Sequence, residues 1–320
     1  MQTKTLNNDL IEAIKRSLPS GNGLTKKLMN ILNIGKEAVY RRLRCEVPFT
    51  FAEASLLSKS LGISLDHISS ACMGDQALFH LYIMNNEDPF DTYYRTSKDL
   101  LQNYTAIKHH PGAEWYTASN TIPHAFYMKY EYLAKFLLYK WVYQQNRIEN
   151  VKYYADLEIP AKVREIQLAY AEETKALAYS CFIWDEIMFL SLVNDIRYFY
   201  DINLLTEKEK NQLKGELFSM MDTLEGWAER GEYENGKKVY FYISNINFEA
   251  TYSYLSTDSI KLSFIRLYAI NIISTTDRSI FEYQKNWIQS LKKYSTLISV
   301  SGEKQRIRFF EKQRSLIEKL

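Results

Sequence analysis

Apolar residues recur with a helical period in two short segments between residues 24 and 44, LTKKLMNILNIGKEAVYRRLR. In the first segment they fall at spacings of three and four, which predicts an amphipathic helix. These residues are Leu24, Leu28, Ile31 and Leu32. In the second segment Val39 and Leu43 are four residues apart and are expected to point inward. The pattern predicts two short helices that pack on a common apolar core.

The two segments meet at Asn33, where a tight turn needs a left-handed backbone. Glycine adopts that conformation most easily, and asparagine is the next most tolerant residue. Five polar residues of the second segment then lie on the opposite, exposed face or at its edges: Lys36, Glu37, Tyr40, Arg41 and Arg44. This arrangement is typical of a helix-turn-helix that binds DNA. A helical hairpin with solvated lysines and arginines is the alternative.

The stretch from Leu24 to Asp66 resembles the λ-repressor-type (Cro/C1-like) helix-turn-helix family. The run IGKEAVYRRL is also similar to the recognition segment of lac-repressor-like proteins. In such families the residues after the turn enter the major groove. The resemblance implies that Lys36, Glu37 and Arg41 read bases. It implies phosphate contacts for Lys26, Lys27, Tyr40 and Arg44.

Two residues depart from the family pattern. Met29 stands where the family prefers a small residue, and Arg42 stands where it prefers an apolar one. Either the second helix is rolled so that Leu43 takes the apolar place, or the base-reading positions shift by one residue.

Further helices are expected around this motif. Thr50 and Glu53 have the spacing of a capping box, which predicts a helix that continues to Leu61 before Gly62. Ser64 is expected to cap another short helix through Leu65 and Ile68, and an opening helix is expected over residues 6–18. Five helices in about 70 residues match the repressor-type domain. We therefore assign residues 1–73 to a helix-turn-helix domain that binds DNA.

Residues 74–320 are expected to form a mainly helical α+β domain. Helical patterns cover residues 127–145, 161–178, 184–200, 207–229, 279–294 and 303–320. The period changes to two in residues 239–243 and 248–254, and residues 260–273 complete a predicted three-stranded antiparallel meander. Residues 77–84 and 115–118 are weaker strand candidates. The fold class is thus mainly α with a smaller β component, a small antiparallel sheet within a helical domain.

The chain has 25 tyrosines, an unusual number. Four of them, in the strands that the sequence predicts, are the candidates to line a pocket for a small-molecule or peptide effector: Tyr240, Tyr242, Tyr252 and Tyr254. The alternative is that these tyrosines are half-buried sheet residues that pack against their neighbours.

The net charge of +2 hides an asymmetry. Residues 1–70 contain 10 Lys and Arg against 6 Asp and Glu, a net charge of +4, and the remainder of the chain carries −2. A basic head on a near-neutral body fits a protein whose head alone faces phosphate. Because the excess is small, affinity for double-stranded DNA is expected to need two heads, which implies a homodimer that also uses residues 74–320 for dimerisation.

A second basic cluster lies in residues 291–320, whose 8 Lys and Arg stand against 3 glutamates. Its helix is expected first to pack on the domain. A dimer contact and a phosphate contact are the alternatives, in that order.

Chemistry of other kinds has little support. Cys45, Cys72 and Cys181 are far apart and form no CxxC pair, so neither disulfides nor a zinc site is expected. His109, His110, His124 and Glu114 are poor metal candidates, because adjacent histidines rarely turn to one ion. Asp185 and Glu186 diverge on a helix and are not expected to act as an acid–base pair. With no phosphate-binding or nucleophile motif, we expect no enzyme activity, no cofactor and no metal.

The chain has no apolar run of about 18 residues and no secretory signal, which predicts a cytoplasmic protein without membrane contact. The sequence thus predicts a cytoplasmic, homodimeric, sequence-specific DNA-binding regulator of transcription. The alternative is a ligand-sensing or protein-interaction module whose helix-turn-helix is only a scaffold.

Overall fold

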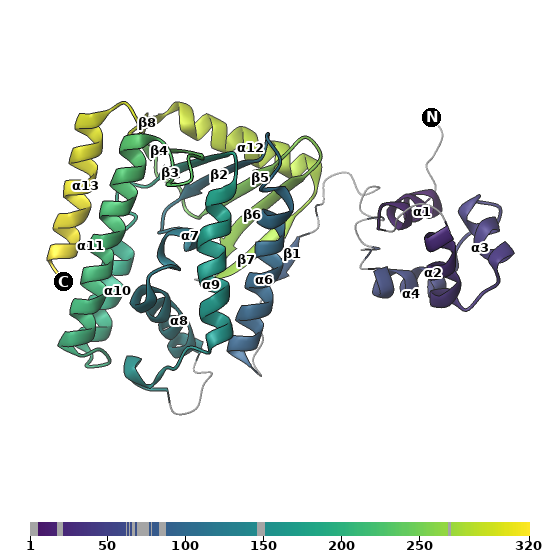
Figure 1. The fold of residues 1–320 in the computed structure, drawn as a ribbon, viewed down its shortest axis with the longest axis horizontal. Coiled ribbons are helices and arrows are strands. Elements are labelled where there is room, and N and C mark those ends of the chain that lie inside the picture. Colours follow the sequence, from purple (N-terminus) through teal and green to yellow (C-terminus); the bar gives the residue numbers. More distant parts are fainter. Residues whose placement is uncertain are drawn as a thin grey trace. The chain divides into compact units, whose positions relative to one another are not determined.

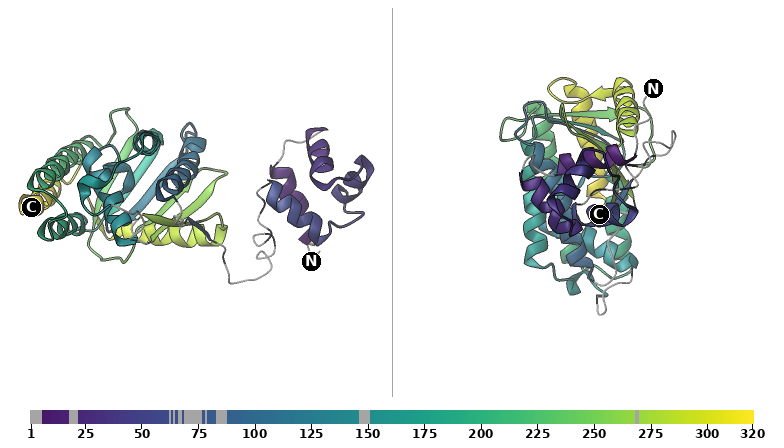
Figure 2. Two further views of the ribbon diagram at one scale, coloured as in Figure 1. Left: turned by 90° about the horizontal axis from the view of Figure 1, so that it is seen from below. Right: turned by 90° about the vertical axis from the view of Figure 1, so that its right-hand side faces the viewer.

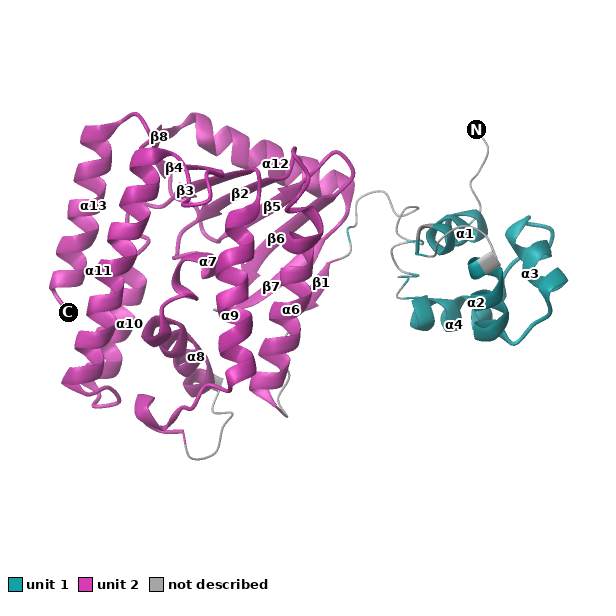
Figure 3. Cartoon of the chain, in the orientation of Figure 1, with its two compact units in different colours: residues 1–78 teal, residues 79–320 magenta. Residues whose placement is uncertain are grey.

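The computed structural model describes residues 6–17, 22–61, 63, 65, 68, 77, 79–82, 88–145, 151–267 and 270–320. The chain divides into two compact units, Met1–Leu78 and Phe79–Leu320 (Figure 3). The boundary expected at residue 74 lies outside the described residues. So do Cys72 and Ser64, where the fifth helix of the first unit is expected to begin.

The first unit contains the helices α1 (Leu6–Ser17), α2 (Asn22–Leu32), α3 (Lys36–Leu43) and α4 (Phe51–Leu61). Each helix contributes an apolar side to one core, as the helical spacing predicts. The buried members of this core are Leu10, Ile14, Leu24, Leu28, Leu32, Val39, Leu57 and Ile63. Met29 and Leu43 are partly buried against it. The two helices expected on either side of Asn33 are therefore present and packed on a common core.

The salt bridge between Arg42 and Glu53 ties α3 to α4. The Arg42 guanidinium donates two hydrogen bonds to the Glu53 carboxylate, of 2.6 and 3.1 Å, and both side chains are only 15% exposed. Glu53 also accepts from the backbone N–H of Thr50 at 2.9 Å, and the Thr50 hydroxyl accepts from the N–H of Glu53 at 3.2 Å. Burial raises the pKa of Glu53, but the hydrogen bonds from Arg42 and Thr50 outweigh it and lower the pKa below the ordinary 4.5. The expected capping box is thus present, and its Glu53 carboxylate also binds the Arg42 guanidinium.

The second unit is built on one eight-stranded mixed sheet, in the order β1-β7-β6-β5-β2-β3-β4-β8 (Figure 1). Its strands are β1 (His80–Tyr82), β2 (Glu114–Ser119), β3 (Tyr179–Trp184), β4 (Lys238–Ser244), β5 (Tyr252–Ser256), β6 (Lys261–Leu267), β7 (Asn271–Thr275) and β8 (Ser295–Leu297). The strands β2, β3 and β4 are parallel, and every other pair is antiparallel.

The prediction of a small antiparallel sheet in a helical domain is wrong. The strands β4 and β5 were expected to be neighbours in a meander, but β2 and β3 lie between them. The stretch expected to be one strand over residues 260–273 contains β6 and the first three residues of β7. Parallel pairing needs long crossovers, and the helices that supply them separate β2, β3 and β4 in the sequence. Local period therefore identified β4 but not its partners.

Helices cover both faces of this sheet (Figures 1 and 2). They are α6 (Pro89–Ile107), α7 (His124–Tyr127), α8 (Glu131–Gln145), α9 (Ala161–Glu173), α10 (Leu190–Asp201), α11 (Glu207–Arg230), α12 (Arg278–Lys293) and α13 (Glu303–Glu318), with short 3-10 turns at Tyr154–Asp156 and Thr174–Ala176. Alternate side chains of β2 lie on opposite faces of the sheet. Trp115 belongs to the larger core with α6 and α9, whereas Tyr116 belongs to the core under α12. Within the described ranges no helix has the length and apolarity that a membrane span needs.

The basic C-terminal helix α13 packs on α11 and α10. Arg314 pairs with Asp222 at 2.8 Å and with Glu225 at 2.6 Å, both on α11. Arg306 is buried and donates to the carbonyl of Ile298 at 3.1 Å. Arg314 and Arg306, two of the eight cations of the basic cluster, therefore contribute to the packing of α13, the first of the expected roles.

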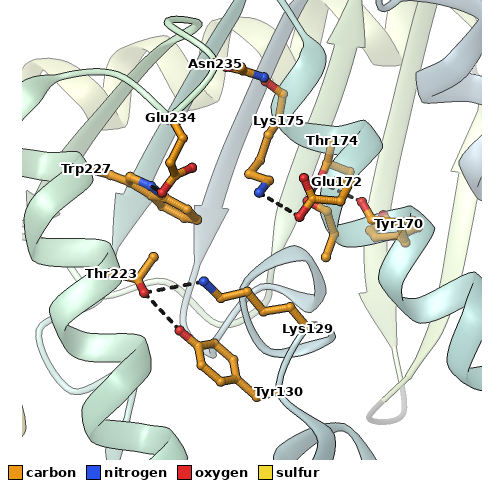
Figure 4. A network of polar contacts seen from close by, with 11 residues as sticks. Lys129, Tyr130, Tyr170, Glu172, Thr174, Lys175, Thr223, Trp227, Glu234 and Asn235 are labelled. Carbon is orange, nitrogen blue, oxygen red and sulfur yellow. Dashed lines mark hydrogen bonds and ion pairs between the residues drawn. The ribbon is translucent and has the colours of Figure 1, made fainter.

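A polar network ties the turn between α7 and α8 to α11 (Figure 4). The hydroxyl of Thr223 lies 3.4 Å from Lys129 Nζ and 3.0 Å from the Tyr130 hydroxyl. Lys129 Nζ also lies 5.5 Å from the centre of the Trp227 ring, whose Nε1 donates to Glu234 at 2.6 Å. Because the charged groups have partners within the network, we read it as a structural anchor.

Replacing Glu53 with alanine is expected to lower the free energy of unfolding of the first unit by about 1–3 kcal/mol, because it removes the cap and leaves Arg42 half-buried without a carboxylate. Hydrogen exchange of peptides from residues 22–61 measures this loss. Tryptophan fluorescence is blind to it, since all five tryptophans lie in the second unit.

Glu37→Ala is the matched control, because the exposed Glu37–Arg44 pair is expected to contribute less than about 0.5 kcal/mol. The Glu53 contribution is complete above the unfolded pKa near 4.5 and is lost as the pH falls through the lowered folded value. Equal exchange in the two variants at neutral pH would contradict this role of Glu53.

Candidate nucleic-acid interface

The backbone between α2 and α3 sets the direction of the exposed face. Asn33 has a φ of 52°, in the left-handed region that the turn was expected to need. Gly35 has an extended backbone, with φ −68° and ψ 161°. It is the N-cap of α3, which begins at Lys36. Val39 is 1% exposed and lies in the core of the first unit. With this residue inward, the opposite side of α3 faces solvent.

The structure brings the expected base-reading and phosphate-binding residues of α3 onto that exposed side. Lys36, Glu37, Arg41 and Arg44 are exposed, and Tyr40 is half-buried at the edge. The Arg41 and Arg44 side chains are 55% and 57% exposed. Lys36 Nζ lies 5.7 Å from the centre of the Tyr40 ring, a weak cation–π contact that steadies the lysine. Lys26 and Lys27 are exposed on α2. We call Lys36, Glu37, Tyr40 and Arg41 of α3, together with its C-cap Arg44, the α3 ridge.

Arg42 is not part of the α3 ridge. Its guanidinium is held by Glu53, so the departure from the family pattern at this position is an ion pair between helices in place of an apolar contact. Val39 and Leu43 supply the apolar contacts of α3 with the core. The residues expected on the exposed side of α3 are therefore those found there, without a shift by one residue.

Glu46 is a functional candidate that the sequence reasoning missed. Its carboxylate lies 3.7 Å from Arg41 Nε and 3.1 Å from Arg44 Nε. Cys45, with a φ of 63°, turns the chain back after α3, and the N–H of Glu46 donates to the carbonyl of Arg41 at 2.9 Å. Glu46 lies beyond the helix, so helical spacing alone carries no signal for it.

Glu37 and Glu46 partly neutralise the positive charge of Arg41 and Arg44 but do not hold these side chains in place. Arg44 also pairs with Glu37 at 3.1 Å. Exposed pairs of this kind contribute at most about 1 kcal/mol each and weaken with salt. Arg41 and Arg44 are therefore free to exchange a carboxylate for a phosphate or a base edge at little cost.

The four tyrosines proposed as a pocket lie in the second unit. Tyr254 is fully buried and stacks on Tyr116, with ring centres 5.0 Å apart. Tyr240 lies 5.5 Å from the Tyr179 ring, and Tyr242 lies under Lys292. These contacts are those of packed sheet residues.

Tyr252 differs from the other three tyrosines. Its ring lies 4.8 Å from Trp287 of α12 and lines a groove with Phe248 and Tyr283. Neither Tyr240, Tyr242 nor Tyr254 lines this groove.

Metal-ligating side chains do not gather in the described parts of the chain, where no group of three or more His, Cys, Asp or Glu could hold an ion. His124 contacts Tyr127, with ring centres 5.5 Å apart. His110 lies 3.8 Å from Asp258, so it has a partner other than the histidine beside it.

Comparisons of the chain with protein-family models, with curated proteins and with solved structures give no match. The resemblance of residues 24–66 to λ-repressor-type proteins therefore stays a sequence-based prediction. We therefore infer the function from the geometry and charge of the first unit.

Proposed function

We propose that this chain is a sequence-specific DNA-binding regulator of transcription that acts through the α3 ridge. The observation that carries the proposal is the roll of α3: Val39 is buried in the core while Lys36, Arg41 and Arg44 are exposed on a helix that follows a tight turn. A helix presented in this way has the size and charge to enter the major groove.

Within this proposal Lys36, Glu37 and Arg41 read base edges. Lysine and arginine donate to guanine, and glutamate accepts from the amino group of cytosine. Tyr40, Arg44, Lys26 and Lys27 contact phosphates and set the register of the helix on the duplex.

The proposal includes a homodimer and a cytoplasmic location. The α3 ridge and Glu46 together carry three cations against two carboxylates, a small excess for a DNA-binding surface. Two copies that bind neighbouring half-sites double the number of phosphate contacts, and such half-sites lie about 34 Å apart along the duplex. The second unit is the candidate for the dimer contact.

Arg41→Ala in the full chain is expected to weaken specific binding by about 1–3 kcal/mol and to reduce discrimination between sequences, because it removes one base contact. Lys27→Ala is expected to weaken all duplexes alike, because it removes a phosphate contact. Fluorescence anisotropy with a selected duplex and a random duplex, over a range of salt, measures both effects.

The same titrations separate the proposal from its alternative. Each phosphate contact is expected to add a slope of about −0.9 to the dependence of log K on log salt. A nearly flat dependence would favour a protein-interaction or ligand-sensing module with the helix-turn-helix as a scaffold. Equal losses on specific and random duplexes for Arg41→Ala would refute its role in reading bases.

Glu46→Gln is expected to strengthen binding to every duplex by up to about fivefold at low salt, because it removes the carboxylate that competes with phosphate for Arg41 and Arg44. Glu12→Gln on α1 is the control, since Glu12 is also exposed and paired with a neighbouring cation, Lys15. An equal gain from both variants would show that the effect reflects only the overall charge.

A further inference from the structure

Two small cavities in the second unit share one residue, Arg266 of β6. The first, of about 50 Å³, is lined by Tyr104 of α6, Trp115 of β2 and Tyr170 of α9, among others. The second, of about 100 Å³, lies beside Tyr127 and Asp195. Since one water fills about 10–15 Å³ of such volume, the cavities hold groups of about four to eight non-hydrogen atoms.

The position of the cavities in the sheet is that of many ligand sites in α/β proteins. Thr121, Ile122 and His124 follow the carboxyl end of β2 and contribute to the cavity walls. The strand β2 lies where the parallel strands β3 and β4 give way to the antiparallel strands β5, β6 and β7. Ligands of α/β proteins commonly bind outside the carboxyl ends of parallel strands, and the loop that follows β2 contributes to both cavities.

Arg266 lacks an ionic partner among the described residues. Its Nη1 donates to the hydroxyl of Thr121 at 2.8 Å and to the carbonyl of Ile122 at 3.3 Å. Asp195 lines the second cavity but is paired with Lys140. Burial lowers the pKa of Arg266, although a guanidinium stays charged at neutral pH. Arg266 is half-buried. A partly desolvated cation without a carboxylate partner is costly to the fold, which favours an anionic occupant beside it.

Two further nitrogens in the walls of the first cavity lack hydrogen-bond partners. They are Nε1 of Trp115 and Nε2 of His124, both buried. Burial, and then the charge of Arg266, hold the pKa of His124 well below its usual range, so its ring is neutral and adds no second positive charge. The indole nitrogen is a donor only. The cavity thus combines one cation, unused nitrogen atoms and aromatic walls.

We propose that this site binds a small organic carboxylate. The carboxylate accepts from the Arg266 guanidinium, which lines both cavities. An apolar part of about three carbon atoms fits the first cavity and packs against Tyr104, Trp115 and Tyr170. The cavity volumes limit the ligand to a few carbon atoms, a short-chain acid rather than a fatty acid. The site lies within the second unit and is separate from the proposed contact with DNA. Its test therefore needs no DNA.

Butyrate is the probe, and isothermal titration of the full chain measures its binding. Butyramide has nearly the same shape without the charge and is expected to bind at least about tenfold more weakly, since hydrogen bonds between a guanidinium and a carboxylate are stronger than those to a neutral amide. Inorganic phosphate is the second anion. It is expected to bind more weakly than butyrate, because it has no apolar part to pack against the aromatic walls.

Arg266→Met is expected to lose butyrate binding by the same factor or more. Arg314→Met is the matched control, an arginine of the same unit whose partners lie on the surface of α11, and it is expected to bind butyrate as the native chain does. Trp115→Phe keeps the aromatic wall and removes Nε1, and it is expected to bind butyrate a few-fold more weakly. This variant decides the matter if circular dichroism shows that Arg266→Met does not fold.

Several results would overturn the site. They are no saturable binding of butyrate to the native chain, equal binding of butyrate and butyramide, and equal loss in Arg266→Met and Arg314→Met. Unchanged binding in Trp115→Phe together with phosphate binding as tight as butyrate would remove the carboxylate as the occupant.

Discussion

The burial of Val39 in the core of the first unit is the constraint on which the functional account depends. Val39 lies in one apolar cluster with Leu28 and Leu57, and this contact sets the roll of α3 about its axis. A rotation of about 100 degrees, one residue along the helix, would in one direction expose Val39 and Leu43 in place of Tyr40 and Arg44. The Arg42–Glu53 salt bridge is a second restraint on the roll of α3, because it holds Arg42 against α4.

The charge on the α3 ridge is reduced by Glu46, an acidic residue that lies beyond the end of α3. Glu46 reaches Arg41 and Arg44 because Cys45 reverses the chain after α3. The surface therefore has a low net charge in the free protein and exchanges weak ion pairs for phosphate contacts when it meets DNA. Such a surface favours binding by two copies over binding by one, since each copy supplies few contacts.

The helices and the turn of the first unit could be predicted from the sequence, because their signals are local. Leu24, Leu28 and Val39 follow the helical period, Asn33 supplies the left-handed turn, and Thr50 with Glu53 forms a capping box. The role of Arg42 could not be predicted, because its partner lies eleven residues away on another helix.

The sheet of the second unit was only partly predictable. The first residues of β4 alternate between buried and more exposed, and the strand was found by its period. In β3 (Tyr179–Trp184) five successive residues are buried, so there is no alternation. The register of β3 with β2 joins Cys181 to Tyr116, 65 residues earlier, across a crossover of helices. The helix α6 begins at an Asp-Pro signal, with Asp88 accepting from the N–H of Asp91, and was not predicted despite it. Arg266 carries no signal in the sequence, because its importance lies in its having no carboxylate partner among the residues that the structure describes.

The central claim is that the α3 ridge enters the major groove of a specific duplex. The most direct measurement is selection of duplexes from a random pool by the full chain, followed by methylation interference at guanine N7, an atom that faces the major groove. The account predicts enrichment of one sequence motif and loss of binding when guanines within it are methylated. A folded protein that enriches no motif, or whose selected duplexes bind equally well after methylation, would contradict it.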